Sequence, residues 1–200
     1  MSCTDSMLYE SLKFCKGNPV PVGIRTHVYA ISKDDIVKWP ELPSTDKVDA
    51  KTLDTLAQYT GDFTLSADKK WLRIDLLDKK GKLEWEISGT KPNVLFLNKI
   101  TLNHPLYNAS AAAFQRMAVA DDLAYLVPQR DGKYRVVGCE AYETTTKPSG
   151  STGEGIEGEA GSNFEIEAPD VCPAPFYAGK IETEAGNISG ATDTSIVTTP

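Results

Sequence analysis

Residues 63–102 decide how this sequence is interpreted. The centre of that stretch is Trp71-Leu-Arg-Ile-Asp-Leu, then Asp78-Lys-Lys-Gly, then Leu83-Glu-Trp-Glu-Ile. Both arms alternate apolar with polar residues, which is the period of a β-strand. The four residues between them end in glycine, which is typical of a hairpin turn. We therefore expect the two arms to form an antiparallel β-hairpin.

The two faces of this expected hairpin differ in character. Its buried core is predicted to be made by Leu72, Ile74, Leu76, Leu83, Trp85 and Ile87. Its polar face is made by Arg73, Asp75, Glu84 and Glu86. Arg73 lies opposite Glu86 in this register, which is favourable, whereas Asp75 lies opposite Glu84, which is not. A solvated sheet face explains the polar set. The alternative is that these four side chains line an aqueous channel built by several subunits.

Composition and charge suit a globular chain and weaken several classes of function. No apolar run approaches the length of a membrane span, and the start Met1-Ser-Cys-Thr-Asp does not look like a signal peptide, so we expect cytoplasmic synthesis and no membrane partner. The four cysteines, Cys3, Cys15, Cys139 and Cys172, form no CxxC pair, and free or buried thiols are expected. Residues 148–200 carry nine acids and one base, so specific nucleic-acid binding is not expected.

The chain divides into an N-terminal arm, residues 1–22, a single β-barrel-like domain, residues 23–185, and a flexible C-terminal tail, residues 186–200. A short helix is expected within residues 49–59, and residues 144–161 predict either a flexible loop or an extended hairpin tip. Residues 94–97 and 100–102 are expected to form one longer strand or a bent pair. Further strands are expected at residues 24–31, 63–66, 123–127, 134–137, 164–168 and 180–183. The sum predicts a mainly β fold, an antiparallel barrel or sandwich, with one flanking α-helix.

That helix is expected over residues 108–121. Asn108 or Ser110 can cap its start, and its apolar stripe includes Phe114 and Met117, which we expect to pack on the same core as the hairpin. A stripe of this kind is typical of core packing and gives no support to a ligand site.

Catalytic motifs are absent from the sequence. No GxSxG, HExxH, Walker loop or dinucleotide fingerprint occurs, so we predict no catalytic, cofactor-binding or metal-binding residues and no enzymatic activity. Glu84 and Glu86 share a strand face and have the residue types of a glycosidase acid and base. Strand faces carry such pairs very often, so this interpretation ranks third, behind two others.

The first of these rests on the order of motifs along the chain. An arm precedes Gly23-Ile-Arg-Thr-His-Val-Tyr-Ala-Ile-Ser and Asp34-Asp-Ile-Val-Lys-Trp-Pro. The expected hairpin, the lone helix, Asp131-Gly-Lys-Tyr-Arg-Val-Val-Gly and a Gly/Glu-rich loop follow, then Phe164-Glu-Ile-Glu-Ala and Pro173-Ala-Pro-Phe-Tyr-Ala-Gly. This order resembles that of prophage major tail proteins, the tail-tube subunits, over roughly residues 23–183.

The resemblance implies a β-barrel-like fold with a flanking helix, hexameric rings, and rings stacked into a tube that conducts DNA. It implies further copies of this chain and other tail proteins as partners, the bacterial host cytoplasm as the place of assembly, and the virion tail as the final location. The lumens of such tubes are polar and often acidic. Arg73 departs from a uniformly negative lining.

The second interpretation belongs to another class of protein. It is a β-sandwich module that binds a ligand such as a carbohydrate, with Trp39, Trp71 or Trp85 as the platform. The alternation that assigns Trp85 to the core face of the hairpin weakens it.

Overall fold

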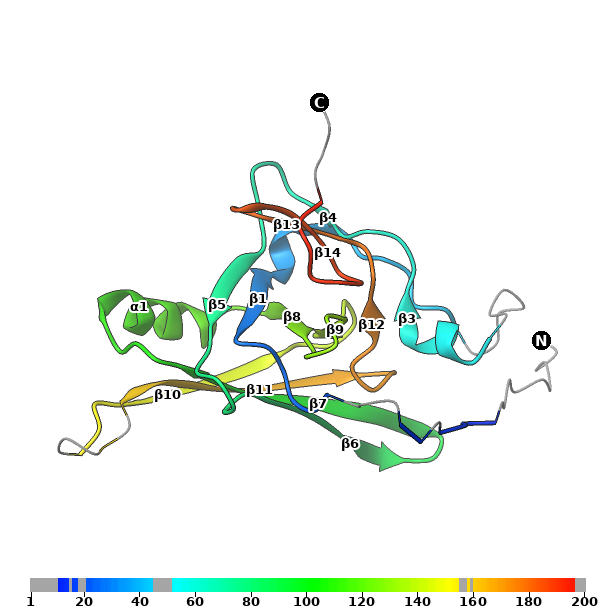
Figure 1. Ribbon diagram of the computed structural model, residues 1–200, viewed down its shortest axis with the longest axis horizontal. Helices are drawn as coiled ribbons and strands as arrows, with labels where there is room; N and C mark the ends of the chain where they lie inside the picture. Colours follow the sequence, from blue (N-terminus) through cyan, green and yellow to red (C-terminus); the bar gives the residue numbers. More distant parts are fainter. Residues whose placement is uncertain are drawn as a thin grey trace.

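The computed structural model describes residues 11–14, 16–17, 21–44, 52–154, 158 and 160–196. Within these residues most of the regular structure is β-strand, and there is one α-helix, so the predicted mainly β fold with a single helix is confirmed. Two sheets pack face to face, and two small two-stranded sheets cover the far side of the larger sheet (Figure 1).

The larger sheet has six strands and is buried on both faces. Its pairs are antiparallel except for a parallel pair at one edge. In sheet order the strands are β3 (Gln58–Tyr59), β12 (Phe176–Tyr177), β9 (Tyr134–Val137), β8 (Leu123–Pro128), β1 (His27–Ser32) and β5 (Leu72–Asp75). All six residues of β8 are buried, because this central strand has covered faces on both sides.

The smaller sheet has four strands, all antiparallel, and lies along the lower side of Figure 1. In sheet order the strands are β10 (Thr145–Ser151), β11 (Gly161–Asp170), β7 (Asn93–His104) and β6 (Lys82–Thr90). β7 has twelve residues and pairs with β11 on one side and β6 on the other. It is therefore a central strand that connects the two sides of the sheet.

Short elements complete the far layer. They are η1 (Lys33–Asp35), β2 (Ile36–Lys38), η2 (Asp54–Ala57), β4 (Thr64–Leu65), β13 (Lys180–Thr183) and β14 (Gly186–Ser189). β2 pairs with β4, and β13 pairs with β14.

Two hydrophobic clusters lie on either side of the six-stranded sheet. The first fills the space between the two sheets and includes Val28 and Tyr125 from one sheet and Ile100 and Phe164 from the other. The second is rich in aromatic residues and lies under the two small two-stranded sheets. In it Phe63 contacts the rings of Trp39, Tyr59, Trp71 and Tyr177.

The helix α1 (Ala109–Ala118) lies beside the β10–β11 end of the smaller sheet (Figure 1). Asn108 caps it, because its side-chain oxygen accepts a hydrogen bond from Ala111 N at 3.0 Å. Phe114 packs edge-to-face on Phe164 with ring centres 5.7 Å apart. Met117 is 70% exposed, so the prediction that it packs on the core is wrong.

The expected hairpin between the two arms of residues 71–87 does not form. β5 pairs with β1, with Arg73 opposite Tyr29, and β6 pairs with β7 across nine residues. The pairings of Arg73 with Glu86 and of Asp75 with Glu84 are therefore wrong. Alternation identifies strands and their faces, but it does not identify their partners. β6 pairs with β7 across the turn at Lys91-Pro92, which gives a longer ladder of backbone hydrogen bonds than the expected hairpin would have had.

The predicted hairpin core is correct only in part. Ile74 and Leu76 are buried in the first cluster, and Leu83 is partly buried against it. The remaining three are wrong: Leu72 is 48% exposed, Trp85 44% and Ile87 68%. Leu72 lies in a strand at the edge of its sheet, and the covered part of β6 ends at Leu83.

The predicted loose tail is wrong for residues 186–196. β14 pairs with β13, and the side chain of Asp193 is 7% exposed and bonded to Arg25 and Tyr134. For residues 144–161, the hairpin alternative is correct, because β10 pairs with β11. Residues 49–59 contain the short η2 and β3 in place of the expected helix.

Parts of these predictions lie outside the described residues. They are residues 1–10, 15 and 18–20 of the arm, residues 45–51, residues 155–157 and 159, and residues 197–200. Cys3 and Cys15 are among them. Cys139 and Cys172 are buried free thiols, as expected.

Candidate functional site

The outer face of the four-stranded sheet, the face turned away from the first cluster, is polar. Alternation along β6 places Lys82, Glu84 and Glu86 on it, because Leu83 between them packs on the core. Lys82 Nζ lies 2.6 Å from Glu84 Oε2. Cross-strand neighbours share a face, and the charged neighbours from β7, β11 and β10 are Lys99, Lys147, Glu165 and Glu167. The outer face thus spans all four strands.

Ion pairs link the strands across this face. Lys99 Nζ lies 2.6 Å from Glu86 Oε1 and 3.9 Å from Glu167 Oε1, and Lys147 Nζ lies 2.8 Å from Glu167 Oε2. The hydrogen bond to Glu86 raises the pKa of Lys99, and the hydrogen bond from Lys147 lowers the pKa of Glu167. Exposed pairs of this kind contribute little to stability, because water and salt screen them. The face is therefore hydrated and close to charge balance.

Both outer strands of this sheet have an open side in the described part of the chain. β6 and β10 stand at the two ends of the strand order, with nine and seven residues. Pro148 lies within β10, yet the ladder to β11 continues past it, so its missing N–H faces the open side. Because the direction of the N–H groups alternates along a strand, Thr146 and Gly150 also direct theirs outward.

An apolar strip lies on the inner side of β6, beyond the covered core. Trp85 and Ile87 are its exposed members, and Phe96 is the cross-strand neighbour of Ile87. The guanidinium of Arg135 lies 4.9 Å from the Trp85 ring centre and 4.0 Å from that of Phe176. This cation–π stack joins β6 to the six-stranded sheet.

The structure separates the four residues that the sequence grouped as a channel lining. All four are exposed, but Arg73 and Asp75 lie on β5 of the six-stranded sheet, where Arg73 Nε lies 2.8 Å from Asp75 Oδ1. Glu84 and Glu86 lie on the outer face of the smaller sheet. Whether any of them faces a lumen stays a prediction.

Asn98 and Asp170, two of the buried polar residues of the smaller sheet, were not predicted from the sequence. Asn98 is fully buried and bonds to Ala174 N at 2.9 Å and Cys172 O at 3.2 Å. Asp170 is 1% exposed. The signal was present in the alternation, because position 170 continues the inward series of Phe164 in β11 and position 98 continues that of Ile100 in β7.

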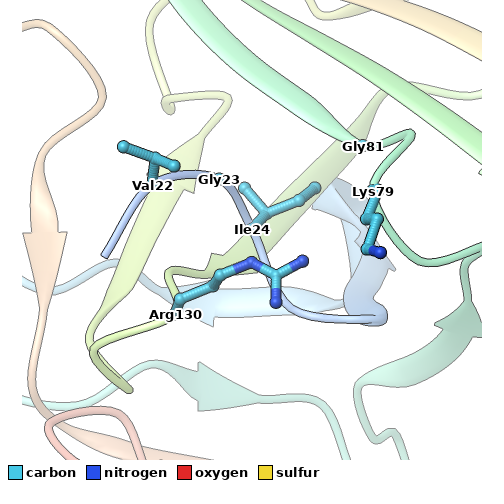
Figure 2. A pocket seen from close by; sticks show the side chains of 6 residues that line it. All are labelled: Val22, Gly23, Ile24, Lys79, Gly81 and Arg130. Atoms are coloured by element: carbon cyan, nitrogen blue, oxygen red, sulfur yellow. The ribbon is translucent and has the colours of Figure 1, made fainter.

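An open pocket of about 490 Å³ lies where the chain enters β6. It is lined by Val22, Gly23, Ile24, Lys79, Gly81 and Arg130. Figure 2 shows Arg130 extending below Ile24 toward the side on which Lys79 lies. Arg130 Nη2 is 2.8 Å from Asp78 Oδ1. With two cationic side chains in its lining, the pocket suits an acidic group better than a basic one.

Neither a metal-binding cluster nor a membrane-spanning helix occurs among the described residues. No group of three or more His, Cys, Asp or Glu side chains there is placed to hold a metal ion. No described helix has the length and apolar character needed to cross a bilayer. Comparison with protein-family models, with curated proteins and with solved structures found no match.

Proposed function

We propose that this protein is a structural subunit that assembles with copies of itself into a ring, by joining the four-stranded sheets edge to edge. One observation carries the proposal: a four-stranded antiparallel sheet has two long open edges and an ion-paired polar face that spans every strand. Exposed strand edges are templates for pairing with another chain. A repeated contact between β6 of one copy and β10 of the next is heterologous and closes by rotation.

The number of strands favours such closure. Four antiparallel strands alternate in direction, so β6 and β10 run in opposite directions within one copy. When β6 of one copy meets β10 of the next, the new pair is also antiparallel, and the alternation continues around the ring. Neither edge strand needs to change its conformation or direction to form this contact.

The resemblance to tail-tube subunits supplies the finer proposal. Six copies would form a wall of 24 strands, four from each copy, and stacked rings would form a DNA-conducting tube in a virion tail. Glu84 and Glu86 would face the lumen together with the other charged residues of the outer face. Their balanced charge suits passage of DNA, because few unpaired bases are present there to bind phosphates and release counterions. In this proposal the protein has no catalytic role.

The carbohydrate-binding alternative keeps one favourable observation, the half-exposed Trp85 beside the exposed Ile87. Trp71 is 1% exposed and is not available as a platform. Trp39 lies at the opposite side of the six-stranded sheet, in the second cluster. If purified protein stays monomeric and binds a glycan that protects Trp85 from solvent, this alternative replaces the structural one.

The test of edge pairing uses a proline and a matched alanine at the same position. Gly150→Pro removes an outward N–H of β10, whereas Gly150→Ala adds a comparable Cβ, for which the nearest atom is Gly161 O at 3.5 Å, and keeps the N–H. Sedimentation velocity at high concentration should show assemblies for the wild type and Gly150→Ala and mainly monomer for Gly150→Pro. Equal assembly of both variants, with unchanged circular dichroism, would remove β10 from the contact.

A further inference from the structure

A second pocket, of about 190 Å³, lies at the end of β11 and plays no part in the proposed ring contact. Its lining comes from the loop after β2, from β3, from the loop after β9 and from the end of β11. Three aromatic side chains line it, Trp39, Tyr59 and Tyr142, together with two carboxylates, Glu140 and Asp170. The charged side chains that line this pocket are thus acidic, whereas those that line the first pocket, Lys79 and Arg130, are basic.

The aromatic walls are held by the second cluster. Trp39 packs edge-to-face on Phe63 with ring centres 5.3 Å apart, and Tyr59 lies 6.3 Å from the same ring. Tyr142 is 38% exposed and its carbonyl accepts a hydrogen bond from Lys33 Nζ at 2.7 Å. Two walls are therefore anchored in the fold, and the third is fixed through its backbone.

Asp170 is the buried group of the pocket. Its Oδ1 accepts hydrogen bonds from Val171 N at 2.6 Å and Cys172 N at 3.4 Å. Its Oδ2 is buried and has no hydrogen-bond partner among the described residues. The cation whose charge acts on Asp170 is Lys33, which is already bonded to Asp122 Oδ1 at 2.8 Å. Among the described residues, the carboxylate therefore has no positive partner of its own.

A buried carboxylate without a cation is unfavourable, and the faces of aromatic rings attract cations. Two carboxylates repel an anionic ligand, and a neutral one would leave the charge of Asp170 uncompensated. We propose that this pocket binds an organic cation, an ammonium or guanidinium group carried by a basic side chain or by a small amine.

The pH dependence of binding follows from the groups around the site. Burial raises the pKa of Asp170 to about 6. Burial also raises the pKa of the hydroxyl of Tyr59 and of the thiols of Cys139 and Cys172, so these groups stay neutral at pH 7. The other charged groups facing the site, among the residues the structure describes, are Glu140, at its lining, and Lys33, in its pair with Asp122. Binding of a cation should therefore strengthen from pH 5 to pH 7.5, as Asp170 ionises.

Nuclear magnetic resonance titration of the full-length ¹⁵N-labelled protein tests the proposal. n-Butylammonium chloride should shift the amides of Val171 and Cys172, the donors to Asp170, and the Trp39 indole, with a saturable curve. 1-Butanol, the neutral control of the same length, should not. Tighter binding of Nα-acetyl-lysinamide than of butylammonium assigns the cation to a basic side chain, and the reverse order assigns it to a small amine.

Matched variants separate charge from shape. Asp170→Asn keeps the volume and the Oδ1 acceptor, and it should weaken butylammonium binding about tenfold or more. Glu143→Gln, a neighbouring exposed carboxylate outside the lining, should leave the affinity unchanged. The proposal is overturned by an absence of saturable shifts with both cations, by equal affinity for 1-butanol, or by equal affinity of the Asp170→Asn variant. Each of these outcomes would mean that Asp170 is a buried acid with a structural role and no ligand.

Discussion

Asp193 anchors the C-terminal segment to the body of the fold, and its removal should destabilise the protein. The carboxylate accepts hydrogen bonds from Arg25 and from the hydroxyl of Tyr134, and it lies 3.6 Å from His27 Nε2. Tyr134 is fully buried. In Asp193→Ala the tyrosine hydroxyl would lose its charged acceptor and keep neutral neighbours such as His27 Nε2, at 3.2 Å.

The size of the effect follows from these contacts. A hydrogen bond between a buried hydroxyl and a charged group contributes about 1.5–3 kcal/mol. The side chain of Arg25 is 35% exposed, so its pair with Asp193 adds at most about 1 kcal/mol. We expect Asp193→Ala to lower the free energy of unfolding by about 3 kcal/mol. For a chain of this size, that corresponds to a fall in Tm of about 6–12 °C.

Differential scanning calorimetry measures this fall, and Asp78→Ala is its matched control. Asp78 pairs with Arg130 at 2.8 Å, but both partners are exposed, so its removal should leave Tm unchanged. Asp193→Asn keeps one acceptor and should fall between the wild type and Asp193→Ala. If Asp193→Ala melts within about 1 °C of the wild type, the contacts of Asp193 with Arg25 and Tyr134 do not stabilise the fold.

The remaining predictions concern stability. Asp170→Asn should stabilise the protein increasingly as pH rises from 4.5 to 7.5, by up to about 3 kcal/mol, because the raised pKa makes ionisation of Asp170 unfavourable in the folded state; a pH-independent difference in Tm would contradict this. Trp85→Ala should lower the free energy of unfolding by about 2–3 kcal/mol in urea titration, less than the loss of a fully buried tryptophan, and a loss above about 5 would mean that Trp85 is buried. Phe114→Ala should cost about 2–3 kcal/mol and Met117→Ala under about 0.5, and equal effects would contradict the orientation of the helix.

Local signals predicted the elements whose partners are near in sequence. The Asp131-Gly132 turn joins β8 and β9 as expected, and Asn108 caps the helix as expected. The helix face was harder to predict, because Phe114 and Met117 both belong to the apolar stripe but only Phe114 meets the sheet. Amphipathic spacing gives the stripe, and the neighbouring strand decides which part of it is covered.

Long-range pairing was not accessible to the same reasoning. The alternating arms of residues 71–87 fitted a hairpin, yet β5 pairs with β1, and β6 pairs with β7. For β5 the competing partner, β1, lies far away along the chain, whereas β6 pairs with the next strand, β7, across the Lys91-Pro92 turn, which the alternation did not indicate. Trp85 lies on the inner face of its strand, but its stack with Arg135 of the six-stranded sheet leaves the ring 44% exposed. The polar composition of residues 186–196 suggested a loose tail, because nothing in it showed that Asp193 meets Arg25.

Negative-stain electron microscopy of the concentrated, purified protein tests the central claim most directly. Edge-to-edge joining of the four-stranded sheets predicts closed rings with a central channel, and short stacks of such rings as concentration rises. Six-fold averages would support the tail-tube proposal in its finer form. A protein that remains monomeric at every concentration, or that forms only two-fold dimers, would contradict ring assembly through β6 and β10.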